Sequence, residues 1–101
     1  MSNKMHVSGV PSKVTEVVVL LCQDYKARIQ KREAPEGYTV GEIIEEALLV
    51  CEVGIRKEMF DDICLLRGYW CSPINYMIGK DQYYARKRKV IKNIATALHL
   101  I

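Results

Sequence analysis

The sequence lacks the features that mark secreted, membrane-spanning and catalytic proteins. No N-terminal stretch pairs a basic start with an apolar run and a small-residue cleavage site, and no apolar run is long enough to cross a bilayer. The chain has no glycine-rich phosphate loop, no G-x-S-x-G elbow and no H-E-x-x-H motif. Its two histidines, His6 and His99, lie near opposite ends of the sequence. We therefore expect a cytoplasmic protein that is not an enzyme and has no membrane contact and no cofactor.

Cysteines are few and widely spaced. The four residues Cys22, Cys51, Cys64 and Cys71 contain no C-x-x-C pair, and a zinc site built from Cys64, Cys71 and a histidine has little support because no ligands are closely spaced. Three of the four lie inside apolar helical patterns. We expect them to be small buried hydrophobic residues in a reducing compartment, with no bound metal.

Length and patterning predict one all-α domain. The 101 residues, half of them apolar, suffice for one modest core, and no segment alternates convincingly for a sheet. The fold class we predict is a compact bundle of four or five helices that ends in a helix-turn-helix-like pair. Within the single domain, 1–101, residues 1–11 form a flexible arm, 12–68 a helical support and 72–101 the helix-turn-helix-like region.

Apolar periodicity and capping signals give the expected helices. The first helix starts near Ser12 and buries a face containing Val14, Val17, Val18, Leu21, Tyr25 and Ile29. The run from Val17 to Leu21 also fits a buried strand, but the helical period continues to Ile29. After a turn at 34–38, a second helix begins at Thr39, and a third ends at Gly68. Ser72 and Pro73 then open a short helix that closes at Gly79, and Asp81 is the expected N-cap of a long last helix.

Charge is strongly segregated along the chain. Residues 80–92 contain six Lys or Arg and one acid, whereas residues 33–62 contain nine acids and two basic residues. A local basic surface is expected where a protein meets a polyanion. The alternative, that the run is a solvated helix face balancing the acidic middle of the chain, stays open.

The last helix carries the candidate site. A short helix, a tight turn and a long basic helix follow one another in the order of a helix-turn-helix, whose second helix reads the major groove of DNA. Glutamine can pair with adenine, and arginine with guanine. We expect Tyr84 to pack in the core, in a stripe with Ile91 and Leu98 that also contains Lys87, and Trp70 to anchor the junction before the short helix. The predicted DNA-binding residues are Lys80, Gln82, Tyr83, Arg86, Lys87, Lys89 and Lys92.

The C-terminal third resembles small phage transcriptional regulators of the ArpU and RinA kind. The likeness lies in 67–70 (Arg-Gly-Tyr-Trp), in 79–84 (Gly-Lys-Asp-Gln-Tyr-Tyr), in 87–91 and in the Ile-Ala-x-x-Leu pattern of 94–98. The resemblance implies a helix-turn-helix similar to sigma-factor region 4 and sequence-specific DNA binding. It matches Gln82, Tyr83, Arg86 and Lys89 to the reading and backbone-gripping positions.

Two functions therefore stand as hypotheses. The first is a DNA-binding transcription regulator of phage or mobile-element origin, whose partner is double-stranded DNA. The alternative is a small helical adaptor or inhibitor that acts on RNA polymerase or another protein. The high apolar content also leaves room for a two-fold homodimer, which would present two reading helices to a palindromic site.

Overall fold

The computed structural model describes residues 9–31 and 39–101, and within them every regular element is helical. The predicted all-α bundle is confirmed. Most of the predicted arm (1–8) and the predicted turn at 34–38 lie outside the described residues. Four α-helices and four short 3-10 helices follow one another: α1 (Ser12–Gln30), α2 (Thr39–Ala47), η1 (Leu48–Val50), η2 (Val53–Ile55), α3 (Arg56–Leu65), η3 (Tyr69–Cys71), η4 (Pro73–Tyr76) and α4 (Lys80–Ala97).

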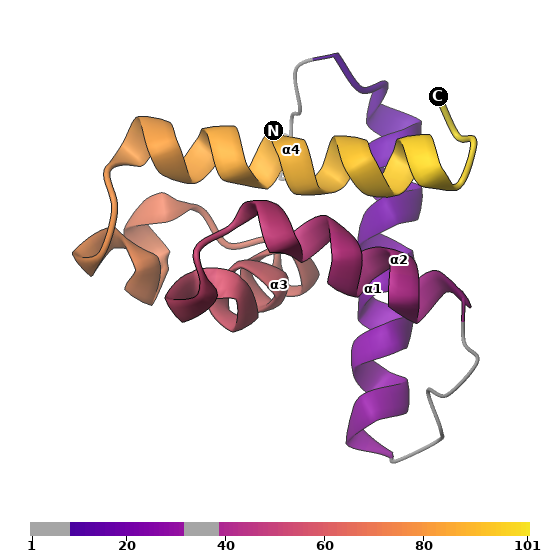
Figure 1. Ribbon diagram of the computed structural model, residues 1–101, viewed down its shortest axis with the longest axis horizontal. Helices are drawn as coiled ribbons and strands as arrows, with labels where there is room; N and C mark the ends of the chain where they lie inside the picture. Colours follow the sequence, from indigo (N-terminus) through magenta and orange to yellow (C-terminus); the bar gives the residue numbers. More distant parts are fainter. Residues whose placement is uncertain (1–8, 32–38) are drawn as a thin grey trace.

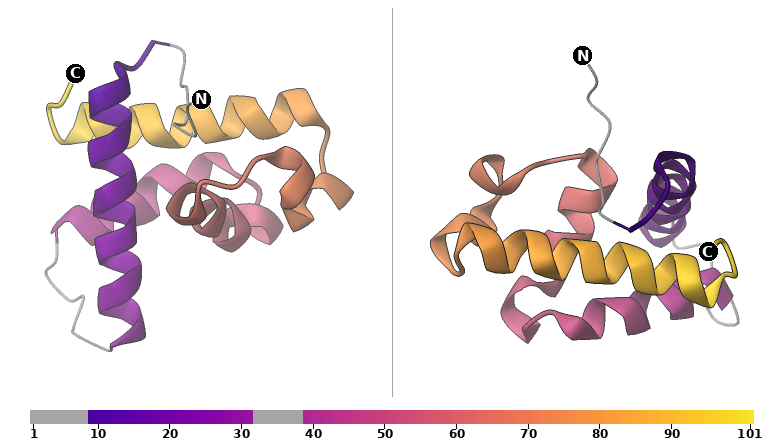
Figure 2. Two further views of the ribbon diagram at one scale, coloured as in Figure 1. Left: turned by 180° about the vertical axis from the view of Figure 1, so that it is seen from behind. Right: turned by 90° about the horizontal axis from the view of Figure 1, so that it is seen from above.

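Helix α4 lies along one side of the molecule and organises the packing. Helix α2 runs beside it in the opposite chain direction, and α1 crosses behind both (Figures 1 and 2). The η3 and η4 segments lie next to the N-terminal end of α4 in both views. One long face of α4 is therefore left uncovered by the other helices. None of the helices in the described part of the chain has the length and apolarity needed to cross a membrane.

The inward face of α1 differs from the predicted one. Val17 and Ile29, expected inside, are 40% and 44% exposed, whereas Thr15 and Cys22 are buried. Because 17–21 is apolar throughout, its periodicity does not fix which side faces the core. Contacts with α3 decide this: the Gln23 amide donates to the Cys64 carbonyl at 2.7 Å, and Lys26 pairs with Asp61 at 3.1 Å. The buried residues of α1 are Thr15, Val18, Val19, Cys22 and Tyr25.

The expectation that the cysteines are buried is confirmed for three of the four and wrong for Cys71. Cys22, Cys51 and Cys64 are buried and Cys71 is exposed, all as free thiols. Burial raises the pKa of Cys22 to about 12 and that of Cys64 to about 11, so both remain neutral at physiological pH. The described residues contain no group of three or more side chains that could hold a metal ion.

The segment between α3 and α4 is built from short turns. Helix α3 ends at Leu65, and Leu66 takes a left-handed conformation with φ 58°, so the helix stops before the predicted Gly68. The predicted cap at Ser72 is confirmed, because its hydroxyl accepts from the Ile74 N–H at 3.1 Å. The helix that follows is a 3-10 helix of four residues, shorter than the expected 72–78 segment. The first member of the helix-turn-helix-like pair is therefore a single tight turn.

Candidate nucleic-acid interface

Helix α4 starts one residue after Gly79. The Gly79 N–H donates to the side-chain oxygen of Gln82 at 3.4 Å. Asp81, predicted as the N-cap, instead occupies the first helical turn, where its charge lies near the positive end of the helix dipole. The correction is one of position, because Gly79 provides the extended backbone that precedes the helix.

One side of α4 is exposed along its length and carries its unpaired cations. Arg88, Lys89 and Lys92, which we call the basic face, are exposed, and none of their side chains has a hydrogen bond or ion pair within residues 9–31 and 39–101. Their spacing places them on neighbouring rows of one helix side. Lys80 and Gln82 are also exposed, at the start of the helix. The structure thus brings four of the predicted residues, Lys80, Gln82, Lys89 and Lys92, to the surface and adds Arg88 to them.

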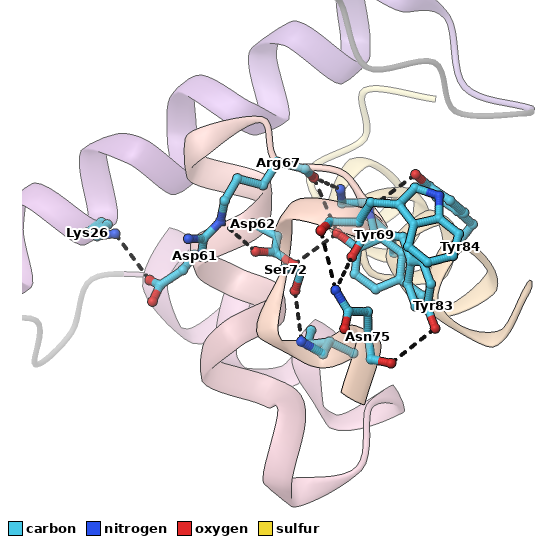
Figure 3. Close-up of polar contacts among 12 residues, drawn as sticks. Lys26, Asp61, Asp62, Arg67, Tyr69, Ser72, Asn75, Tyr83 and Tyr84 are labelled. Atoms are coloured by element: carbon cyan, nitrogen blue, oxygen red, sulfur yellow. Dashed lines mark hydrogen bonds and ion pairs between the residues drawn. The ribbon is translucent and has the colours of Figure 1, made fainter. Parts of the chain in front are cut away.

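The opposite side of α4 contains a buried polar cluster, seen in Figure 3. Tyr83 is fully buried, and its hydroxyl donates to the Asp62 carboxylate at 2.9 Å, with the Arg67 carbonyl oxygen 3.2 Å away. Asp62 is also fully buried, and its other oxygen accepts from Arg67 Nε at 2.9 Å. Both carboxylate oxygens are therefore satisfied by protein groups, as a buried charge requires. Burial, followed by the hydrogen bond to Asp62, raises the pKa of Tyr83.

Lys87 belongs to the same cluster. It is 4% exposed, its ammonium group donates to the Arg67 carbonyl, and it lies 4.9 Å from the centre of the Tyr83 ring and 5.9 Å from that of Tyr84. Burial lowers the pKa of Lys87 to about 8, although the Asp62 charge acts in the opposite direction. A lysine held in this way stabilises the junction between α3, η3 and α4.

Two predicted contacts are therefore wrong. Tyr83 and Lys87, expected to touch DNA, are both buried, with 0% and 4% of their surface exposed. Lys87 lies within the apolar stripe of α4. There its charge is stabilised by the Arg67 carbonyl and two tyrosine rings rather than by solvent. The Tyr83 hydroxyl is hydrogen-bonded to the buried carboxylate of Asp62, which is 21 residues earlier in the chain.

Arg86 is exposed only in part and already has a partner. Its guanidinium donates to both carboxylate oxygens of Glu52, from Nε at 3.2 Å and from Nη2 at 3.1 Å. The hydrogen bond from Arg86 lowers the pKa of Glu52, which therefore stays ionised. Glu52 lies between η1 and η2, so the pair joins that turn to α4. The carboxylate of Glu52 occupies two of the guanidinium nitrogens, so any contact of Arg86 with DNA would depend on its remaining N–H donors.

Tyr84 connects α4 to η3. It is partly buried against the core, in line with the prediction, and its hydroxyl accepts from the Tyr69 N–H at 3.2 Å. A Cβ at Gly68 would lie 3.2 Å from this hydroxyl, so the absence of a side chain there allows the close approach. The rings of Tyr69, Tyr83 and Tyr84 meet edge to face around the cluster.

The aromatic residues before α4 contradict one further prediction. Trp70 was expected to anchor a buried junction, but it is 74% exposed, and that role falls to the buried Tyr69. Tyr76 and Met77 are 90% and 59% exposed. These exposed positions were missed in the sequence, where the only signal is that they lie between Gly68 and Gly79, outside any long helical period.

Comparisons with known proteins identify no relative. The sequence matches no family model, and searches among curated proteins and solved structures give no significant match.

Proposed function

We propose that the protein binds double-stranded DNA through the exposed side of α4. The observation that carries the proposal is the basic face: three cations without partners lie on one uncovered side of an 18-residue helix. Such a helix is about 27 Å long, from 1.5 Å per residue. The major groove of B-DNA is wide enough to admit an α-helix, and cations on the sides of that helix then contact the phosphates at the edges of the groove.

The roles within this interface follow from position. Gln82, on the first turn, is placed to contact a base edge, whereas Arg88, Lys89 and Lys92 neutralise phosphates. Lys80 adds a cation at the helix start. Asp81 is the only acid in α4 and limits contact at that end. Because η4 has only four residues, α4 is held in place mainly by α2 and α1, with smaller contacts from η1, η3 and η4.

The resemblance of the C-terminal third to phage regulators of the ArpU and RinA kind extends this proposal. It suggests that DNA binding serves transcription regulation, without enzymatic activity, in a phage or mobile element. In this chain Tyr83, one of the residues that carry the likeness, supports α4 from inside, so base reading would fall to Gln82, while the basic face contacts phosphates.

The decisive experiment is a titration of a short, fluorescently labelled duplex at several salt concentrations. Each neutralised phosphate adds about 0.9 to the slope of log affinity against log salt. A Lys89→Ala/Lys92→Ala double variant should therefore bind more weakly and lose up to about 1.8 from the slope. A Lys13→Ala/Lys57→Ala variant, which removes the same charge from exposed positions on α1 and α3, is the matched control. A salt-independent response, or equal losses in both variants, would contradict the proposal.

A hollow lined by residues of α1, α2, η1, η2 and α3 favours the second candidate, an adaptor that binds another protein, for which RNA polymerase is the partner to test. It has a volume of about 470 Å³, with an apolar floor that includes Leu48 and Phe60 and with Val53, 77% exposed, at its edge. Lys26, Lys57, Glu45 and Asp61 add charges around it. Such a concave apolar site with a polar rim suits a protein segment. Nuclease-treated, purified RNA polymerase should then retain the wild type but not Val53→Asp, and no retention would exclude RNA polymerase as the partner.

A further inference from the structure

Two aromatic side chains and one methionine are exposed in the segment before α4. We define the aromatic platform as Trp70, Tyr76 and Met77, which are 74%, 90% and 59% exposed. Three large apolar side chains exposed between residues 70 and 77 make this segment a candidate binding surface. All three belong to the short segment that contains η3 and η4.

Hydrogen bonds hold the backbone of this segment in one conformation. The Asn75 amide donates to the carbonyl oxygens of Tyr69 and Trp70, both at 3.3 Å, and so ties η4 to η3. The Tyr69 hydroxyl donates to the Ile78 carbonyl at 2.7 Å, and Ser72 caps η4 (Figure 3). The exposed rings are therefore displayed on a fixed support, which lowers the entropy lost when they bind a partner.

The same contacts fix the platform relative to the basic face. The Tyr69 backbone is bonded to the Tyr84 hydroxyl, and the Tyr69 ring lies 5.3 Å from that of Tyr83, so two residues of α4 hold η3. Tyr76 and Met77 precede the start of α4 at Lys80 by only a few residues. From Lys80, the basic face begins about 12 Å along the helix at Arg88. Platform and basic face thus form parts of one rigid unit.

The charge around the platform selects the chemistry of its partner. The exposed cations that follow the platform along the chain are Lys80, Arg88, Lys89 and Lys92, with Asp81 the one acid in α4, whereas Arg67 and Arg86 are paired with Asp62 and Glu52 and Lys87 is buried. An exposed aromatic surface in a cationic region suits a ligand that combines flat apolar rings with negative charge. Unpaired nucleotides have both properties, because their bases stack on aromatic side chains while their phosphates meet Lys and Arg.

We infer that the platform binds unpaired bases that adjoin the duplex held by α4. This inference rests on the proposed function and names its preferred substrate, a duplex with a single-stranded extension. Bases inside a duplex are stacked on one another and cannot use the platform, so the rings add affinity only where strands are open. Trp70 and Tyr76 stack on bases, and Lys80 lies between the platform and the basic face to contact the connecting phosphates.

Trp70 is the only tryptophan in the chain and reports directly on the platform. We would titrate the full chain with a blunt duplex, with the same duplex carrying a thymidine overhang at either end, and with single-stranded oligothymidine. Stacking on a base should quench Trp70 fluorescence, and an overhang should strengthen binding about tenfold relative to the blunt duplex. Trp70→Ser and Tyr76→Ser should each remove most of that preference and leave blunt-duplex affinity unchanged. Val53→Ser, which removes an equally exposed apolar side chain elsewhere, is the matched control.

The outcomes separate the inference from the proposal on which it rests. Quenching and overhang preference that Tyr76→Phe keeps and Tyr76→Ser loses would support base stacking. Equal binding of blunt and overhanging duplexes without quenching would overturn the inference while the proposed function stands. Absence of binding to every oligonucleotide would overturn both. A dimer in light scattering that Trp70→Ser dissociates would show that a second copy of the chain occupies the platform, and would also overturn the inference.

Discussion

The two sides of α4 contain the same kinds of residues in opposite environments. Lys87 and Lys89 are two residues apart, yet Lys87 is 4% exposed with a carbonyl and two rings around its ammonium group, whereas Lys89 is exposed and unpaired. Rotation around the helix by two residues is enough to move a side chain from the core to the solvent. A basic run in a helix is therefore a mixture of structural and surface charges.

The largest effect that tests this difference is expected at Asp62. The Asp62→Ala variant lacks the buried carboxylate. Arg67 and Tyr83 each lose a hydrogen bond to it, and Lys87 loses a nearby negative charge. Removing one partner of a buried ion pair typically lowers the free energy of unfolding by about 3–5 kcal/mol. Urea denaturation followed by circular dichroism measures this loss.

Its matched control is the neighbouring residue. Asp61 pairs with Lys26 at 3.1 Å at a partly exposed position, and Asp61→Ala should lower the free energy of unfolding by about 1 kcal/mol or less. Similar losses in the two variants would show that the buried cluster has no special role, and the distinction between the two sides of α4 would fail.

The next largest effect is expected for Tyr83→Phe. The ring stays in place, but the hydroxyl that donates to Asp62 is lost, and a hydrogen bond to a charged group typically contributes about 1.5–3 kcal/mol. The free energy of unfolding should fall by this amount, as measured in urea. Tyr76→Phe, at a position 90% exposed, should leave it unchanged. A Tyr83→Phe variant as stable as the wild type would show that the Asp62 contact adds nothing.

Local signals made the helical architecture predictable. Ser72 and Pro73 predict the start of η4 because capping depends on adjacent residues only. The apolar neighbours of Cys22, Cys51 and Cys64 predict that these cysteines are core residues. The helical class followed from the apolar periodicity in the same way. These features need no knowledge of distant contacts.

Which residues of α4 are buried and which are exposed depends on contacts with residues far away in the sequence, so local patterns do not predict it. Lys87 lies in the apolar stripe of α4, but its burial requires the Arg67 carbonyl, which a left-handed Leu66 and the early end of α3 bring into place. Arg86 is occupied by Glu52, from a turn 34 residues earlier. Trp70 is exposed because Tyr69 fills the position behind it. In each case the environment of the side chain depends on a contact that the local sequence pattern does not predict.

The pH dependence of stability tests the environment of Lys87 with a smaller effect. In the unfolded chain Lys87 stays protonated up to its ordinary pKa of 10.5, whereas in the folded protein its pKa is lowered to about 8. Between these values the unfolded state binds more protons, so the contribution of Lys87 to stability increases as pH rises. The free energy of unfolding of the wild type minus that of Lys87→Met should rise by about 1 kcal/mol between about pH 8 and about pH 9.

Other buried groups act in the opposite direction at higher pH. The raised pKa values of Tyr83 and of the buried thiols mean that their contributions are lost as pH rises beyond the ordinary range of these groups. Comparison at each pH with Lys87→Met removes the thiol contribution, because both proteins contain the same cysteines. Urea titrations at intervals across this range supply the values. Parallel curves for the two proteins would contradict a shifted Lys87.

The smallest effect on stability is expected on the exposed side of α4. Lys89→Ala and Lys92→Ala remove no side-chain hydrogen bond or ion pair to the part of the chain that the structure describes, and alanine favours the helix as strongly as lysine or more. The urea midpoint should therefore stay at the wild-type value or rise slightly, although the same substitutions are expected to weaken DNA binding. A clear fall in the midpoint would mean that these lysines also have a structural role, and the contrast between Lys87 and Lys89 would then be one of degree. Unchanged stability with reduced DNA affinity would instead assign the two sides of α4 to packing and to binding.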